Sequence, residues 1–438
     1  MKSNVVKVVL IALLAIALFI PVSMIQNLVG ERQARRNEAV TGIAEGWGMR
    51  QTVAGPYLAI PYERSWTEVK RDVVDGKPRE QRIERTESHV LHAPAQSVEW
   101  TVSAEISEKA RGIYKARLYG AKLQAQGTLA VPARASEHGK VQYKWGTPRL
   151  VIGISDPRGI RAAPAATVGG RSYEFAPGSA DGSSGGLHVL LTDVPATQKL
   201  SLPFSFSLEL GGSEAFAIAP LGSDTTVSMR ADWPHPSFLG RFLPARHEIG
   251  AAGFTASWKV SRLAGQARAA NCAWPCVNEQ IAVSFIEPAG LYQQLERASK
   301  YGFLFIGLTF AAFLLFELLR RLAIHPVQYA LVGLALAMFF LLLTALSEHI
   351  DFAAAYAIAT FACVGLITGY LARVLRSARI GLAFGGALAA LYAMLFALLK
   401  AEDYSLLGGS LLLFGLLAAV MIATRRVDWY GLGAKAPA

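Results

Sequence analysis

One histidine of the chain, His235, lies between two prolines and close to a tryptophan in the segment ADWPHPSFLGRFLPARHEIG (231–250). An imidazole titrates near neutral pH, so a histidine held in place by its neighbours could act as a general base. A base also needs a positioning partner and a substrate pocket, and the surrounding sequence indicates neither.

The alternative for this segment is a structural brace. Pro234 and Pro236 hold the backbone extended and remove two N–H donors, which excludes a central strand. We expect a long connection between a strand that ends near Ala231 and one that begins near Gly253. Its apolar side chains should pack on a β core or meet the membrane surface. The motif consists of Trp233, Pro234, His235, Pro236, Phe238, Leu239 and Gly240.

A second group of titratable residues, Glu348, His349 and Asp351, lies in ALSEHID (345–351) at the end of an apolar stretch. Three such groups so close together could bind a metal ion or relay protons. A polar turn at the membrane interface is the simpler interpretation.

Glu317 lies inside another apolar stretch, within one helical turn of Arg320 and Arg321. A charge in a membrane span is costly, so it is paired, placed near the surface or functional. An ion pair explains Glu317, and a transport role is the alternative.

Cys272 and Cys276 in NCAWPCV could form a disulfide or remain as free thiols. Their spacing is not that of a C-x-x-C redox pair. The sequence has no G-x-S-x-G, H-E-x-x-H or P-loop motif. We therefore predict no catalytic residue, metal site or cofactor, and a protein that is not an enzyme.

These residues depend on the elements that carry them, and the apolar stretches dominate the chain. About 20 apolar residues make a helix long enough to cross a membrane. Six stretches qualify, with some 270 more polar residues between the first and the second. They are residues 8–29, 301–319, 327–346, 352–371, 380–399 and 404–423.

The basic residues set the orientation, since Lys and Arg in short loops stay in the cytoplasm. Ten of them lie in the two tails and in every second short loop. This accounts for most of the net charge of +11 without nucleic-acid binding. Both termini are predicted to be cytoplasmic. The domains are residues 1–29 (cytoplasmic N-terminus and uncleaved transmembrane signal anchor), 30–298 (extracytoplasmic β-rich domain), 299–424 (five-helix transmembrane bundle) and 425–438 (cytoplasmic tail).

The large domain shows repeated two-residue periodicity, in WTVSAEI (100–106), LPFSFSLEL (202–210) and FTASWKV (254–260). This alternation predicts strands with one buried and one wet face. The fold class is an integral membrane α-helical bundle of six transmembrane helices. A large, mainly antiparallel, sandwich-like β domain is inserted between helices 1 and 2.

Several segments along the chain resemble the inner membrane protein CreD family, a group of cell envelope integrity proteins. They are VGERQARR (29–36), VAGPYLAIPY (53–62), VIGISDPRGI (151–160), DWPHPSFLGRFLPA (232–245), residues 298–317 and 325–349, and DWY (428–430). The resemblance implies a Gram-negative inner membrane protein with a periplasmic domain. It also implies links to envelope stress, the β-lactam response and colicin tolerance, and no catalytic residue.

Three functions remain open at this point. The first is a non-catalytic binding or scaffold protein, whose periplasmic β domain binds an unknown envelope protein or a cell-wall component. The second is a small transporter or lipid-handling protein that uses Glu317 or Glu348, His349 and Asp351. The third is a wall-modifying enzyme. The expected partners include membrane lipids, exclude nucleic acid and allow a homo-oligomer through small-residue ridges such as Gly365-x3-Gly369.

The topology can be tested with reporter fusions. A reporter fused after residue 323 should give a cytoplasmic signal, and one near residue 200 a periplasmic signal, because the basic loops stay inside. Alkaline phosphatase, active only outside the cytoplasm, measures this. Phosphatase activity after residue 323 would refute the orientation.

Overall fold

The computed structural model describes most of the chain and divides it into two compact units. The membrane unit comprises Met1–Asn37 and Pro288–Ala438, and the β unit comprises Glu38–Glu287. The described residues are 2–74, 77–132, 136–138, 141–163, 165–179, 185–261, 263, 279–285, 290–320, 325–400, 407, 409–411, 414–415, 418 and 421–422.

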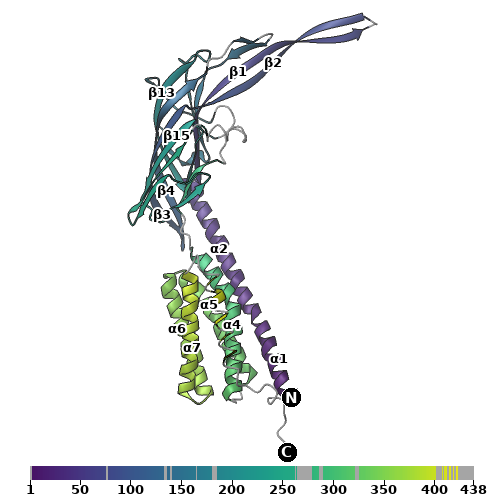
Figure 1. Cartoon of the computed structure of the whole chain (residues 1–438), viewed down its shortest axis with the longest axis vertical. Coiled ribbons are helices and arrows are strands. Elements are labelled where there is room, and N and C mark those ends of the chain that lie inside the picture. Colours follow the sequence, from purple (N-terminus) through teal and green to yellow (C-terminus); the bar gives the residue numbers. More distant parts are fainter. Residues whose placement is uncertain are drawn as a thin grey trace, which may run out of the picture. The chain divides into compact units, whose positions relative to one another are not determined.

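The membrane unit is helical (Figure 1). Its described helices are α1 (Lys2–Ala17), α2 (Phe19–Trp47), α4 (Leu291–Arg320), α5 (Pro326–Ser347), α6 (Phe352–Val374) and α7 (Ala378–Lys400). Among the described residues, four helical segments are long and apolar enough to cross a membrane. They are Val9–Trp47, Pro326–Ser347, Phe352–Val374 and Ala378–Lys400.

The two other predicted spans, residues 301–319 and 404–423, are not among these four segments. Residues 301–319 lie within α4, which is not among these four. Most of residues 404–423 lie outside the described part of the chain. The helix α2 continues beyond residue 29, the end of the predicted anchor, to Trp47, because residues 30–47 contain no proline. The first strand therefore begins at Gln51 rather than directly after the anchor.

The N-terminal helices pack on α4 and α5 inside the membrane unit. The rings of Phe19 and Phe303 stack with their centroids 4.1 Å apart. The Gln26 side-chain amide donates to the Ser299 carbonyl over 3.1 Å. A Cβ on Gly333 of α5 would meet the side chains of Leu18 and Phe310, so a larger residue there would have to displace them.

The β unit consists of two sheets, as the alternating pattern predicted, and the prediction of a large β domain is confirmed. Sheet A contains β1 (Gln51–Val74), β2 (Lys77–Pro94), β5 (Glu137–His138), β6 (Val141–Trp145), β7 (Arg149–Ile154), β11 (Ala176–Pro177), β12 (Gly186–Leu190), β14 (Ala215–Ala219), β16 (Ser237–Gly240) and β19 (Ile281–Ser284). Sheet B contains β3 (Ser97–Arg111), β4 (Tyr114–Val131), β8 (Ile160–Ala162), β9 (Ala166–Val168), β10 (Arg171–Tyr173), β13 (Leu200–Ser213), β15 (Asp224–Ala231), β17 (Arg246–Gly250) and β18 (Gly253–Val260).

Most strand pairs of the described chain are antiparallel. Two pairs are parallel, β1 with β14 and β3 with β15. Each of them joins strands that are far apart in the sequence.

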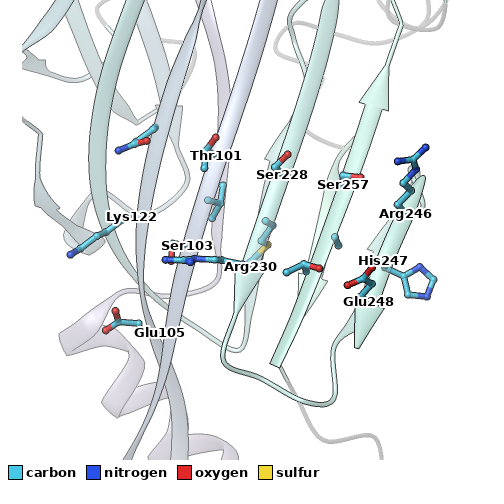
Figure 2. Close-up of a pocket in the computed structure, with 15 residues that line it drawn as sticks. Thr101, Ser103, Glu105, Lys122, Ser228, Arg230, Arg246, His247, Glu248 and Ser257 are labelled. Carbon is cyan, nitrogen blue, oxygen red and sulfur yellow. The ribbon is translucent and has the colours of Figure 1, made fainter. Parts of the chain in front are cut away.

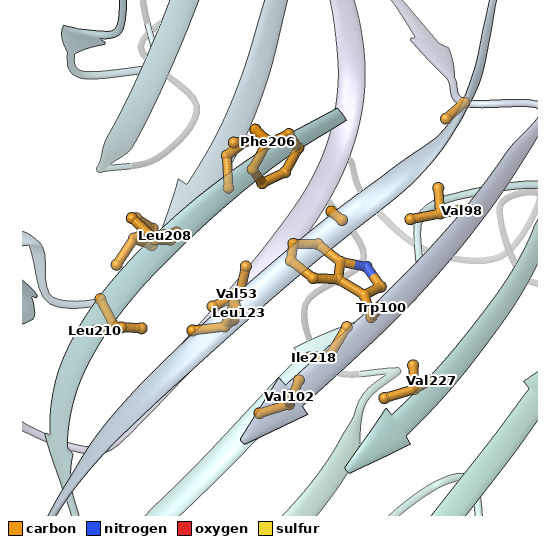
Figure 3. Packing of buried hydrophobic residues seen from close by; sticks show 14 of the residues in the cluster. Val53, Val98, Trp100, Val102, Leu123, Phe206, Leu208, Leu210, Ile218 and Val227 are labelled. Atoms are coloured by element: carbon orange, nitrogen blue, oxygen red, sulfur yellow. The ribbon is translucent and has the colours of Figure 1, made fainter. Parts of the chain in front are cut away.

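One apolar core lies between the two sheets (Figure 3). Val53 and Ile218 enter it from sheet A, and Trp100 and Phe206 enter it from sheet B. The rings of Trp100 and Phe206 meet edge to face at 5.7 Å. Full burial of such side chains contributes about 1.5–3 kcal/mol each, which makes this core the main stabilising feature of the unit.

The hairpin of β1 and β2 extends beyond the sheets as a two-stranded arm (Figure 1). β6 pairs with β1 only from Tyr62 to Trp66. From Thr67, opposite Glu84, to Val74, opposite Lys77, the described pairing is between β1 and β2 alone. Two-stranded ribbons are marginally stable by themselves, so the arm depends on the sheet at its base.

Asp156 joins the start of β1 to the short 3₁₀ helix η1 (Pro157–Gly159). Its Oδ1 accepts the Arg158 N–H over 3.2 Å and the Arg158 Nε over 2.9 Å. Its Oδ2 accepts Arg158 Nη2 over 3.0 Å and the Met49 N–H over 2.9 Å. Asp156 thus occupies both carboxylate oxygens in linking two backbone segments.

Gln51 completes this link from inside. Its buried Nε2 donates to the carbonyls of Asp156 over 2.9 Å and Gly211 over 3.1 Å. A Cβ on Gly159 would lie 2.3 Å from the same Nε2, so the 3₁₀ turn requires glycine there.

Trp47 fastens the end of α2 to sheet B within the β unit. Its Nε1 donates to the Tyr119 carbonyl over 3.1 Å. The Arg161 guanidinium lies 4.2 Å above the indole ring and donates to the Trp47 carbonyl over 2.7 Å. A cation over an indole ring adds about 0.5–1 kcal/mol at such a partly exposed site.

The charge of Asp156 should make this junction sensitive to acid. Hydrogen bonds from Arg158 hold the pKa of Asp156 below its ordinary value, although burial acts in the opposite direction. A lowered folded-state pKa stabilises the fold above the unfolded value of about 3.9, and this contribution is lost as the pH falls through the folded-state pKa. Asp156→Asn should therefore unfold at a lower temperature than wild type at neutral pH, with the gap closing below about pH 4.

Thermal unfolding of the full-length protein in detergent measures this gap. Asp193→Asn is the matched control, since Asp193 forms an exposed ion pair with Arg171 at 2.6 Å, and such pairs contribute little. A gap that stays constant from neutral pH to about pH 3 would contradict the assigned role of the carboxylate.

Candidate functional site

The outer face of sheet B carries polar side chains in register across five strands. One row runs from β4 to β17 through the pairs Lys122–Ser103, Ser103–Arg230, Arg230–Thr255 and Thr255–Glu248. Because alternate residues of a strand face the same side, the next row lies two residues away. It consists of Gln124, Thr101, Ser228, Ser257 and Arg246.

These rows form a groove because short side chains occupy most of the middle and long ones the margins, while the one long side chain in the middle, Arg230, lies along the floor. Figure 2 shows Ser228 and Ser257 on the floor, Lys122 on one side and Arg246 on the other. The groove has a volume of about 620 Å³, within the usual range for ligand sites. Its floor is hydroxyl-rich, and the core side chains of the same strands point to the opposite face.

The groove contains charges of both signs. Lys122, Arg230 and Arg246 supply three cations, and Glu105 and Glu248 supply two carboxylates. The Arg230 Nε donates to Ser103 Oγ over 3.1 Å, which holds the guanidinium along the floor. No phenylalanine, tyrosine or tryptophan lines the groove, so an occupant must be held by hydrogen bonds and charge.

The groove shows no arrangement for covalent catalysis. Among the described residues, no serine of the groove hydrogen-bonds to its one histidine, His247. Nor does the described part of the chain contain a group of three His, Cys, Asp or Glu residues that could hold a metal ion. The arrangement suits binding.

The sequence pointed to these strands but not to the groove. The alternation in WTVSAEI and FTASWKV places Thr101, Ser103, Thr255 and Ser257 on the wet face. Nothing in either segment shows that β15 pairs between them, in parallel with β3. The signal that was available is the excess of small hydroxyl residues at the outward positions.

The segment around Trp233 crosses from one sheet to the other. β16 follows β15 of sheet B but pairs with β19 at the edge of sheet A, and the chain then returns to sheet B as β17. The predicted strand end at Ala231 and strand start at Gly253 are confirmed, but the expectation of one long connection between them is wrong, since it contains two strands. Both are short, and β17 is exposed along its whole length, so neither gives an alternating pattern.

The aromatic residues of this segment pack on the core and the histidine does not. Trp233, Phe238 and Phe242 are partly buried against the apolar core. The Phe238 ring contacts the Trp258 ring edge to face at 5.9 Å. Leu239 in β16 is 48% exposed, so the motif buries only part of its apolar surface.

Two contacts fix the Trp233 side chain, one to its ring and one from its indole N–H. The Arg117 guanidinium lies 4.3 Å from its ring centroid. Its Nε1 donates to the His235 carbonyl over 2.8 Å, which closes the turn around Pro234. The His235 side chain is exposed and contacts the Trp233 ring edge to face at 6.0 Å. Pro236 precedes β16, and Gly240 at its end adopts a φ of 91°.

Glu348, His349 and Asp351 lie in the turn between α5 and α6 but do not form one site. Glu348 caps α5 and is half-buried, with Oε1 3.7 Å from Arg32 Nε and accepting the Tyr292 hydroxyl over 3.2 Å. Asp351 caps α6 by accepting the Ala353 N–H over 2.9 Å. His349 and Asp351 are exposed.

Glu317 of α4 is buried and accepts the Tyr329 hydroxyl of α5 over 2.8 Å. The side chain of Arg320 and the whole of Arg321 lie outside the described residues, as do Cys272 and Cys276. The structure thus shows a hydroxyl partner for Glu317 that its sequence neighbours did not reveal.

Comparisons with known proteins cover nearly the whole chain. The family model described as inner membrane protein CreD matches residues 3–430. The inner membrane protein CreD of Escherichia coli K12 is 34% identical over 421 residues, which cover 94% of this chain and 91% of that protein. Among solved structures, two of an M1 zinc metallopeptidase from Deinococcus radiodurans align at 8% identity with TM-scores of 0.21 and 0.20. They cover 47% and 75% of this chain and 53% and 90% of those chains.

Trp233 and His235 should respond differently to truncation. Trp233→Ala removes a half-buried ring, and we expect a loss of about 2 kcal/mol, below the 3–5 kcal/mol of a fully buried tryptophan. His235→Ala removes an exposed ring and should change stability by less than about 0.5 kcal/mol.

Thermal unfolding of both full-length variants measures the difference. His235→Ala is the matched control for Trp233→Ala, since it lies in the same turn. If both variants fold like wild type and both lose an envelope phenotype, His235 would instead belong to an active site.

Proposed function

This chain belongs to the CreD family of inner membrane proteins, and on that premise we propose that it is a non-catalytic binding protein of the cell envelope. Its β unit binds a cell-wall component in the groove of sheet B. The family and the apolar helices make it a multi-pass inner-membrane protein. The placement of residues 30–298 in the periplasm is part of the proposal and is supported by the basic loops.

The observation that carries the proposal is the pair of aligned polar rows with charged margins. Hydroxyl groups both donate and accept, so the floor of Ser103, Ser228 and Ser257 can follow a chain of alternating polar groups. The carboxylates and amines of an occupant would meet the cations and carboxylates of the margins. Cell-wall stem peptides carry these groups on an extended polar chain.

A folded protein partner fits the groove less well. Centres of protein–protein interfaces are apolar and enriched in aromatic anchors. The groove has a polar floor and lacks such anchors. This favours a wall peptide over an envelope protein as the occupant.

Catalysis is not needed for the proposed role. Links to the β-lactam response and colicin tolerance, which the family resemblance implies, would follow from contact with the wall or with the envelope around it. The transmembrane helices would hold the β unit at the membrane.

A wall-binding assay tests the proposal. The purified full-length protein in detergent should sediment with isolated peptidoglycan sacculi. Ser228→Trp fills the floor and should weaken binding about fivefold or more, equivalent to ~1 kcal/mol or more. Ser205→Trp is the matched control, because Ser205 lies on the same face of sheet B, on β13, and outside the groove.

Sacculi without stem peptides distinguish the possible occupants. Loss of binding to them supports recognition of the peptide. Unchanged binding of Ser228→Trp would refute the groove as the site. Binding that disappears when the sacculi are cleared of attached protein by protease would identify a protein partner and refute a wall ligand.

A further inference from the structure

The helices α6 and α7 flank an open apolar groove on the membrane unit. It has a volume of about 730 Å³ and is lined mainly by small and aromatic residues. Small residues at Ala353, Ala357 and Ala393 leave the space, and Tyr356 and Phe396 form its walls.

The groove is open because only one of two glycine ridges, the one on α7, packs against the neighbouring helix. On α7, a Cβ at Gly381 would lie 2.8 Å from the Ala372 Cα, and one at Gly385 would lie 2.1 Å from Thr368 Oγ1. This ridge therefore packs α7 directly on α6. On α6, Gly365 and Gly369 have nothing within 4 Å of the Cβ position, and both line the groove.

The groove has the length of a lipid acyl chain. The 17 residues from Ala353 to Gly369 rise about 24 Å along α6, most of the ~30 Å hydrocarbon thickness of a bilayer. A methylene chain, about 4–5 Å wide, needs only roughly 400 Å³ over the same length.

A cation stands at one end of the groove. Lys400, the last residue of α7, has its Nζ 5.3 Å from the ring centroid of Phe396, which lines the groove. A lysine at a helix end in a membrane extends towards the interface, where lipid phosphates lie. Among the described residues of the following segment, Leu407, Leu411 and Phe414 are more than half exposed, so these three side chains are not buried in the groove.

From these observations we propose that the groove between α6 and α7 holds one acyl chain of an anionic phospholipid, with its phosphate at Lys400. The apolar walls bury the chain, and the ammonium group selects the headgroup charge. This inference is independent of the wall ligand on the β unit. A second copy of this chain and the segment 404–423 are the competing occupants.

Photocrosslinking in vesicles tests the lipid. The full-length protein is reconstituted in phosphatidylethanolamine with phosphatidylglycerol that carries a diazirine in its acyl chain. The wild type should crosslink within residues 353–396. Gly365→Leu fills the groove and should lower this yield about tenfold, a loss of ~1.4 kcal/mol of binding.

Gly386→Leu is the matched control. It is the same substitution on α7, in open space and outside the groove, and should leave the yield unchanged. Leucine favours a helix more than glycine does, so both variants should fold. Lys400→Gln should lower the yield with phosphatidylglycerol but not with a phosphatidylcholine probe.

Three outcomes would overturn the proposal. Equal yields from Gly365→Leu and wild type would exclude the groove as the lipid site. No crosslink within residues 353–396 of the wild type would mean that protein covers it. A fall in oligomeric mass for Gly365→Leu, with its crosslinking unchanged, would assign the groove to a second copy.

Discussion

The β unit depends on one shared apolar core, to which sheet A and sheet B each contribute one face. Trp100 and Phe206 meet there with Val53 and Ile218, so no strand of either sheet can turn over without losing its buried side chains. The same alternation sends every second residue of sheet B outwards. The polar groove is thus a by-product of register as much as of residue choice: its rows are aligned because the core rows behind them are aligned.

The packing side chains and the polar groove consequently lie on opposite faces of the same strands. Ser228 can be small and polar because Val227 and Met229, its neighbours on β15, carry the packing. The junction at Asp156 and Gln51 makes a different contribution, because it uses buried hydrogen bonds to fix where the end of α2 enters the unit. Hydrogen bonds between buried partners specify one geometry, since leaving either partner unsatisfied is costly.

The sequence predicted the two kinds of architecture and the strands with clean alternation. It could not give the strand order, because β1 pairs with β14 across more than 160 residues and no local pattern encodes this. The crossover at Trp233 was missed for a related reason: β16 has four residues, and its partner β19 lies beyond Gly253 and β18. Glu348 stood out in the sequence only as one of three titratable residues in a polar turn, and its contacts with Arg32 and Tyr292 come from helices distant in the chain. Two glycine ridges looked alike in sequence, and only the packing of Thr368 and Ala372 separated the one that is filled from the one that is open.

The parallel pairs also set the order in which the β unit can be completed. Sheet A needs β14 between β1 and β19, so it cannot close until Ser284 has left the ribosome, although its first strand begins at Gln51. Contacts of such high sequence separation slow folding. During this interval the long edges of β1 and β2 are exposed, and charged residues of the arm such as Glu68, Arg82 and Arg85 oppose edge-to-edge association between nascent chains.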